Sequence, residues 1–103
     1  QAMPITIDKQ NGATVISVRG EIDHHSARTI MENIDHTISS ALPMRLVLDL
    51  SSVTFMDSSG IAVLLRALRQ MDQLGGNLRV VGIPPQPRRV LDAAGIGRLI
   101  TLE

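Results

Sequence analysis

RLVLDLSSVTFMDSSG, residues 45–60, is the stretch of sequence that decides the fold. Four of its first six residues are apolar, and this nearly continuous apolar run favours a central strand covered on both faces of a sheet. A loop carrying Val53 and Phe55 then leads to the polar Asp57-Ser58-Ser59-Gly60. Apolar residues at helical spacing follow, so we predict a helix that ends at Gly75-Gly76. Its inward face is expected to carry Ile61, Leu64, Leu65, Leu68 and Met71.

The first residues of the chain predict a hairpin. Ile5 and Ile7 alternate with polar residues, as in a strand that is buried on one face only. Asn11-Gly12 marks a turn, and a second strand is expected over residues 14–19. The two strands are therefore expected to pair antiparallel to each other.

A helix is predicted between this hairpin and the central strand. Residues 20–23 break the strand pattern, and apolar residues then recur at helical spacing. Asp23 or Ser26 can cap this helix by accepting hydrogen bonds from its free amides, and Pro43 helps to end it. The apolar face of the helix contains Ala27, Ile30, Met31, Ile34, Ile38 and Leu42.

The remaining residues add two strands and a short helix. Residues 78–83 form an apolar strand, and three prolines precede a helix over residues 88–94 that Gly95 closes. Residues 99–102 are expected to form a last short strand. The resulting order, β-β-α-β-α-β-α-β, predicts a single α/β domain with a mostly parallel sheet and an N-terminal antiparallel hairpin.

Length and composition narrow the possible functions. The 103 residues fit one domain, expected over residues 4–103, with Gln1 and Ala2 as a cloning remnant ahead of Met3. Because 10 basic and 10 acidic residues balance and Phe55 is the only aromatic residue, direct binding of nucleic acid is not expected. The lack of cysteine excludes disulfides and thiolate metal sites. Without a membrane span or a signal peptide, a cytoplasmic protein with no membrane contact is expected.

The segment Asp57-Ser58-Ser59-Gly60 is the candidate functional site. Asp57 is suited to cap the second helix, which would place Ser58 in its first turn. Amides there lack partners within the helix, and the helix dipole favours negative charge, so a phosphate on Ser58 would be tolerated. It would change a neutral hydroxyl into a group with a charge of about −2 and expel a partner packed over it. The alternative is a capping cluster without further function, because Asp, Ser and Gly are ordinary residues at helix ends.

The apolar residues after this segment favour a partner surface beside Ser58. A helix can turn only one stripe toward its own sheet, and Ile61, Leu64 and Leu65 fill that stripe. Ala62 and Val63 must then face either a neighbouring helix or the outside. If they are exposed, they form an apolar patch suited to a protein partner.

Two motifs of the chain resemble the STAS domain family. Residues 53–65, with Asp57-Ser58-Ser59-Gly60 at their centre, resemble the signature of this family. Residues 20–25, Gly-Glu-Ile-Asp-His-His, resemble the strand-to-helix motif of its anti-sigma factor antagonists, notably those of the sporulation type. The likeness covers nearly the whole chain and implies a STAS-like fold.

The resemblance also implies a function as a switch that binds proteins. In this family the serine directly after the aspartate, here Ser58, is phosphorylated by an anti-sigma factor that is itself a serine kinase. The unphosphorylated antagonist binds the anti-sigma factor and frees the sigma factor, and a separate serine phosphatase resets the switch. The implied partner surface comprises Asp23, His24, Asp57, Ser58, Ser59, Gly60, Ile61 and Ala62.

Other functions have less support in the sequence. A STAS module that senses a small ligand, a nucleotide or a lipid, is the alternative, although no cradle of glycines supports it. A receiver-like domain phosphorylated on Asp49 or Asp57 would need a lysine near the last strand, and the only lysine is Lys9.

Catalysis and metal binding are not expected. The sequence has neither a nucleophile-elbow motif nor a Walker-type loop, so we do not expect the protein to be an enzyme. His24 and His25 cannot easily share one metal ion, because adjacent residues on a helix point about 100° apart. No metal or other cofactor is therefore expected.

Overall fold

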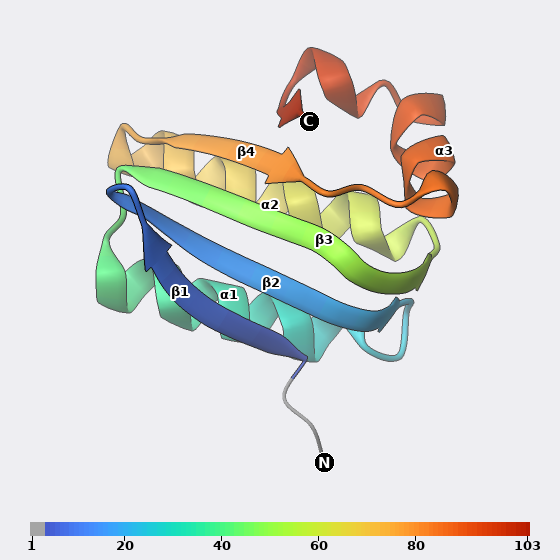
Figure 1. Cartoon of the computed structure of the whole chain (residues 1–103), viewed down its shortest axis with the longest axis horizontal. Coiled ribbons are helices and arrows are strands. Elements are labelled where there is room, and N and C mark those ends of the chain that lie inside the picture. Colours follow the sequence, from blue (N-terminus) through green and yellow to red (C-terminus); the bar gives the residue numbers. More distant parts are fainter. Residues whose placement is uncertain (1–3) are drawn as a thin grey trace.

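Strands β1 to β5 form one sheet in that spatial order in the computed structural model, which describes residues 4–103. β1 and β2 pair antiparallel, whereas β2, β3, β4 and β5 run parallel to one another, which confirms the predicted α/β order (Figure 1). The elements are β1 (Ile5–Gln10), β2 (Ala13–Ile22), α1 (Ala27–Ala41), β3 (Arg45–Met56), α2 (Ser59–Leu74), β4 (Asn77–Val81), α3 (Pro85–Ala93), the 3-10 helix η1 (Ile96–Arg98) and β5 (Thr101–Leu102). The expected cloning remnant at Gln1 and Ala2 lies outside the described residues.

The β1–β2 hairpin forms at the predicted turn. Gln10 pairs with Ala13, so that Asn11 and Gly12 are the two loop residues. Both have positive φ, 54° and 79°, which is the backbone shape of a turn that follows the twist of its strands. Asparagine and glycine tolerate this conformation at little cost, which explains why the local sequence predicted the turn.

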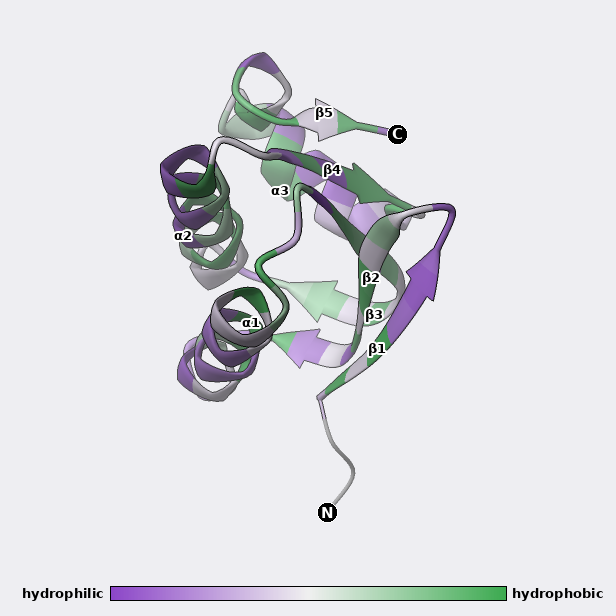
Figure 2. Cartoon of the chain, turned by 90° about the vertical axis from the view of Figure 1, so that its left-hand side faces the viewer, coloured by the Kyte–Doolittle hydropathy of each residue, from purple (hydrophilic) through white to green (hydrophobic). Residues whose placement is uncertain are grey.

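The helices α1 and α2 lie together on one face of the sheet, as Figure 2 shows. Most of the core fills the space between these two helices and the sheet, and each large side chain buried there contributes about 1.5–3 kcal/mol of hydrophobic free energy. The fully buried side chains include Ile16, Ile22, Ile30, Ile34, Leu46, Leu48, Leu50, Met56, Leu64 and Met71. No helix among residues 4–103 combines the length and the hydropathy that a membrane span requires.

The expectation that β3 is covered on both faces is wrong. Leu46 and Leu48 are fully buried beneath the helices, but Arg45 and Asp49 on the opposite face line a hollow of about 540 Å³ that is open to solvent. Val47 also lies on this face and is only 8% exposed. The apolar run correctly predicted the burial of Leu46, Val47 and Leu48. It wrongly predicted a second layer over the face that carries Arg45 and Asp49.

β2 and β3 are both longer than the sequence indicated. β2 continues through residues 20–22, where a break was expected, and β3 continues to Met56 through the expected loop that carries Val53 and Phe55. The two strands support each other, since Glu21 pairs with Phe55 and Ile22 with Met56. The register between the two strands shifts twice, between Ser17 and Arg19 and between Gly20 and Glu21. As a result, both strands end at the same level.

The ends of the helices follow local rules, with differences near the C-terminus. α2 ends before Gly75, which has a φ of 74°, as predicted. α3 begins at Pro85, three residues earlier than expected, because prolines fit the first turn of a helix. The last strand is limited to Thr101–Leu102, and Leu99, expected within it, is 60% exposed.

Candidate functional site

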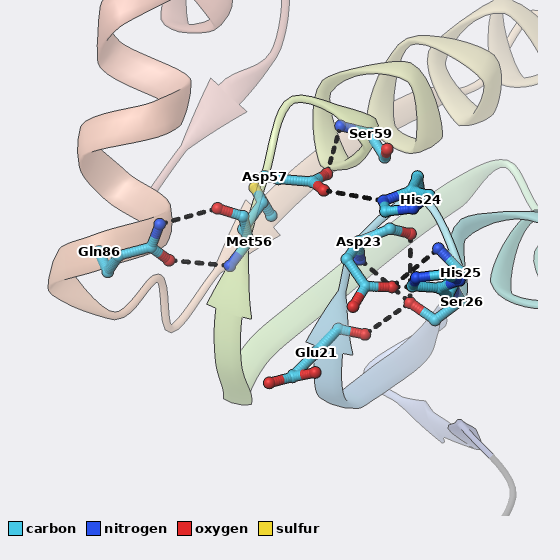
Figure 3. A network of polar contacts seen from close by, with 9 residues as sticks. All are labelled: Glu21, Asp23, His24, His25, Ser26, Met56, Asp57, Ser59 and Gln86. Carbon is cyan, nitrogen blue, oxygen red and sulfur yellow. Dashed lines mark hydrogen bonds and ion pairs between the residues drawn. The ribbon is translucent and has the colours of Figure 1, made fainter.

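Two turns lie side by side where β2 and β3 end (Figure 3). The β2–α1 turn consists of residues 23–26, and what we call the β3–α2 turn consists of residues 57–60, of which the last two already belong to α2. Because the two strands are parallel neighbours that end at the same level, their loops leave the sheet together. The amide of Asp57 donates to the carbonyl oxygen of Ile22 at 3.0 Å, which ties the two turns to each other.

The β3–α2 turn is capped by Asp57, as the sequence predicted. Its Oδ1 accepts a hydrogen bond from the amide of Ser59 at 2.7 Å, and its carbonyl oxygen accepts one from the amide of Gly60 at 3.0 Å. Ser58 already has helical backbone angles, with φ −62° and ψ −17°. Its side chain is exposed and makes no capping hydrogen bond. The structure therefore leaves the Ser58 hydroxyl accessible to an incoming group.

Ser59 and Gly60 hold the turn against the rest of the molecule. Ser59 is half-buried, and its amide donates to Asp57 Oδ1. Gly60 is buried, and a Cβ at this position would overlap the Cγ of Met56, whose side chain is fully buried. Gly60 thus presents no side chain to a partner. Its role is to let α2 begin directly on the end of β3.

The β2–α1 turn is held by reciprocal hydrogen bonds. Asp23 Oδ1 accepts from the amides of His25 and Ser26, at 2.9 and 3.0 Å. In return, Ser26 Oγ accepts from the amide of Asp23 at 3.1 Å and donates to the carbonyl oxygen of Glu21 at 2.7 Å. Of the two predicted capping residues, Asp23 accepts amides at the start of α1, whereas Ser26 bonds back to Asp23 and caps no amide of the helix. Together they form a capping box, with a serine in place of the more usual Glu or Gln.

The two aspartates give the site its negative charge. The amide of Ser59 is the main cause that holds the pKa of Asp57 below its usual value, and the nearby charge of Asp23 opposes this effect. The amide of Ser26 is likewise the main cause that lowers the pKa of Asp23. Both carboxylates are therefore ionised at neutral pH. The exposed imidazole of His24 lies 3.9 Å from Asp57 Oδ2, so a protonated His24 would partly offset this charge.

The apolar surface beside Ser58 is smaller than expected. Ala62 is exposed and Ile61 is half-buried, but Val63 is only 2% exposed, so the outward position is wrong for Val63. Gly60 lies against Met56, and the buried stripe of α2 starts at this residue. The buried stripe consists of Gly60, Val63, Leu64, Ala67 and Met71. The candidate surface that remains, which we call the paired-turn surface, contains Asp23, His24, Asp57, Ser58, Ser59, Ile61 and Ala62.

Two residues near this surface were missed by the sequence analysis. Phe55 was expected in a loop, but it lies near the end of β3 and is 41% exposed. Gln86 of α3 binds the main chain of Met56 with both atoms of its side-chain amide. No local pattern marks Gln86, since its contact joins residues 30 positions apart in the sequence.

A metal site is not formed by the described part of the chain. The rings of His24 and His25 have centroids 3.9 Å apart. No group of three or more His, Cys, Asp or Glu side chains within residues 4–103 is placed to hold a metal ion.

Residues 4–103 match the family model of the STAS domain. The chain belongs to the STAS domain family. Among its STAS relatives, an anti-sigma F factor antagonist of Paenibacillus polymyxa is 29% identical over 100 residues, which cover 97% of this chain and 86% of the relative. Another, from Lysinibacillus sphaericus, is 30% identical over 83 residues, or 81% of this chain and 71% of the relative.

Solved structures of anti-sigma factor antagonists share the fold. The crystal structure of an anti-sigma factor antagonist from Mycobacterium paratuberculosis matches with a TM-score of 0.85 and 30% identity, covering 95% of this chain and 82% of that chain. The unphosphorylated form of the anti-sigma factor antagonist SpoIIAA matches with a TM-score of 0.79 and 24% identity, covering 96% and 87%, and supports the fold alone. These relatives are named for antagonism of another protein and not for a chemical reaction, in agreement with the expectation of a regulator.

Proposed function

We propose that this STAS domain is an anti-sigma factor antagonist controlled by phosphorylation of Ser58. When Ser58 is unmodified, the paired-turn surface binds an anti-sigma factor that is also a serine kinase, and the sigma factor is released. Phosphorylation of Ser58 ends this binding, and a serine phosphatase restores it. The observation that carries the proposal is the exposed Ser58 hydroxyl at the start of α2, in a chain whose relatives are anti-sigma factor antagonists.

The choice of Ser58 over its neighbour is supported by exposure and by hydrogen bonding. Ser59 is half-buried and donates its amide to Asp57, whereas Ser58 is exposed and makes no capping bond. A kinase must bring the acceptor hydroxyl in line with the phosphorus that is transferred. An exposed hydroxyl without a competing partner meets this need without unfolding of the turn.

The effect of a phosphate on Ser58 follows from the bonds that already exist in the turn. The first-turn amides of Ser59 and Gly60 already donate to Asp57, so they are not free to hold a phosphate. The added charge of about −2 would also be repelled by the carboxylates of Asp57 and Asp23. The phosphate would therefore point outward into the space that the partner occupies. Phosphorylation acts in this proposal by bulk and charge at the surface, with little change in the fold.

The proposal also includes the cellular setting expected from the sequence. The domain acts in the cytoplasm through contacts with proteins, without binding DNA or RNA itself. Its balanced charge, with 10 basic and 10 acidic residues, offers no broad basic face for phosphate backbones.

Binding measurements with the cognate anti-sigma factor test this function. Ser58→Ala should bind within about two-fold of the wild type and should gain no phosphate, whereas Ser58→Asp should bind about ten-fold more weakly or worse, as expected for a desolvated charge placed at an interface. Ser39→Asp, which adds the same charge at an exposed position of α1, is the matched control and should bind normally. Equal affinity for Ser58→Asp and the wild type would contradict the proposal.

Sensing of a small ligand is the alternative function, and the open hollow on the sheet is the observation in its favour. Of the arginines that line it, Arg79 is already paired with Glu103 at 2.6 Å, and Arg45 donates to the carbonyl oxygen of Asn11 at 2.8 Å. These engaged cations are poorly placed to hold a nucleotide phosphate. Thermal shift with a panel of nucleotides should show no stabilisation, and a clear rise in melting temperature would favour the alternative.

A further inference from the structure

The end of β3 lacks a strand partner on one side. β4 pairs only with the first five residues of β3, Arg45 to Asp49, whereas β2 pairs with β3 as far as Met56. Beyond Asp49, the edge of β3 that faces away from β2 continues without β4. α3 packs against β3 in this region, beyond the end of β4 (Figure 1).

Gln86 of α3 takes the place of the missing strand at Met56. Its Oε1 accepts a hydrogen bond from the amide of Met56 at 2.8 Å, and its Nε2 donates one to the carbonyl oxygen of the same residue at 2.7 Å (Figure 3). A primary amide offers one acceptor and a donor in one plane, as a peptide group of a neighbouring strand does. Both bonds are partly buried, so their loss would leave main-chain groups with poor access to water.

The main chain directly before Ser58 is therefore held from two sides. On one side Gln86 binds Met56, and on the other the amide of Asp57 donates to the carbonyl oxygen of Ile22. The fully buried side chain of Met56 adds a third anchor beneath Gly60. Of these three anchors, only the one from Gln86 comes from α3.

We infer that Gln86 is a positioning residue for phosphoryl transfer to Ser58, an inference that rests on the proposed function. In this transfer, Ser58 Oγ forms a bond to the γ-phosphorus of a nucleoside triphosphate held by the partner kinase. The bond from that phosphorus to the bridging oxygen breaks, the nucleoside diphosphate leaves, and the hydroxyl proton passes to a base of the kinase or to water. Gln86 touches none of these atoms and acts through Met56.

Loss of the Gln86 contact should affect the rate of phosphoryl transfer more than the affinity for the partner kinase. Transfer depends on the position of Oγ relative to the phosphorus, and a misplacement of about 1 Å can cost about 100-fold in rate. Binding is spread over the whole paired-turn surface, which includes residues of the β2–α1 turn and of α2 that Gln86 does not contact, and it tolerates a small displacement of one turn better than the transfer step does. Loss of the Gln86 clamp should therefore lower kcat while KM changes little.

The substitution Gln86→Met tests this inference, because methionine has a similar length but cannot form either hydrogen bond. The matched control is Gln70→Met in α2, since Gln70 Oε1 is buried without a hydrogen-bond partner in the described part of the chain. For Gln86→Met we expect faster hydrogen exchange at the Met56 amide and a kcat for Ser58 phosphorylation that is lower by about ten-fold, with KM within about two-fold. Gln70→Met should match the wild type in all three.

These measurements distinguish failure of the inference about Gln86 from failure of the proposed function of Ser58. If Met56 exchanges as slowly in Gln86→Met as in the wild type, or if kcat is unchanged, the inference is overturned and the proposed function stands. If the wild type itself receives no phosphate on Ser58, the proposed function fails and takes the inference with it. Should Gln86→Met not fold, Gln86→Glu keeps the acceptor for the Met56 amide and loses the donor. A partial fall in kcat for that variant supports the inference, and an unchanged kcat overturns it.

Discussion

The β2–α1 turn and the β3–α2 turn begin alike and then differ. Each starts with an aspartate whose carboxylate accepts the amide two residues later, from His25 in one and from Ser59 in the other. In the β2–α1 turn, the fourth residue is Ser26, and its hydroxyl oxygen accepts a hydrogen bond from the amide of Asp23. In the β3–α2 turn, the fourth residue is Gly60, which packs on Met56 without any side chain. One turn is closed by hydrogen bonds and the other by packing.

This difference explains which serine is free to react. Ser26 is committed to three main-chain groups around Asp23 and Glu21, so its hydroxyl supports the structure. Ser58 occupies the position after the aspartate, where the β2–α1 turn carries His24, and both residues are exposed. Because packing at Gly60 replaces a hydroxyl bond, the β3–α2 turn keeps its shape without using Ser58. A serine in a rigid turn can thus remain available for chemistry.

The largest loss of stability is expected when the packed turn is disturbed. Gly60→Ala would place a methyl group against the fully buried Met56, and such overpacking costs about 2 kcal/mol of unfolding free energy, less a gain in helix propensity. Gly97→Ala is the control, since a Cβ there has Leu102 Cδ1 at 3.7 Å as its nearest contact. Urea unfolding measures both variants. Equal stability of Gly60→Ala and the wild type would show that packing does not close this turn.

A smaller loss is expected when the hydrogen-bonded turn is disturbed. Ser26→Ala removes the partly buried hydroxyl that bonds Asp23 and Glu21, and should lower the unfolding free energy by about 1 kcal/mol. Ser58→Ala removes an exposed hydroxyl with no capping bond and should change it by less than about 0.5 kcal/mol. The two variants should show the opposite order in phosphate uptake, which only Ser58→Ala abolishes. A stability loss for Ser58→Ala as large as that for Ser26→Ala would contradict the comparison.

The smallest effect is expected from acid, and it should appear in both turns. Asp23 and Asp57 have pKa values lowered below 3.8 in the folded state, chiefly by the amides of Ser26 and Ser59. A lowered pKa means that their contribution to stability is complete above the unfolded pKa of about 3.9 and is lost as pH falls through the folded value. Urea midpoints between about pH 6 and pH 2 measure this contribution in the wild type, Asp23→Asn and Asp57→Asn. The advantage of the wild type over each variant should shrink on acidification, and a constant advantage would contradict the assignment.

Local residues were sufficient to predict the turns and the caps. Asn11-Gly12, Gly75 and the capping by Asp57 all depend on conformations or hydrogen bonds within a few residues, so the sequence indicated them directly. The exposure of Ser58 beside Asp57 also follows from its place in the first turn of a helix. For this reason the local geometry of these turns was predicted better than the lengths of β2 and β3.

Features that depend on distant residues were not predicted. The continuation of β2 through residues 20–22 and of β3 to Met56 depends on the pairing of the two strands with each other, which neither segment shows alone. The Gln86 contact joins α3 to β3 over 30 positions and has no local signature.

The most direct test of the central claim is the location of the phosphate on the wild-type chain. The protein would be incubated with its cognate kinase and ATP, digested, and analysed by tandem mass spectrometry before and after treatment with hydroxylamine. The account predicts one phosphate on Ser58 that survives hydroxylamine. A phosphate on Ser59 or Ser26, or a hydroxylamine-sensitive phosphate on Asp57, would contradict it.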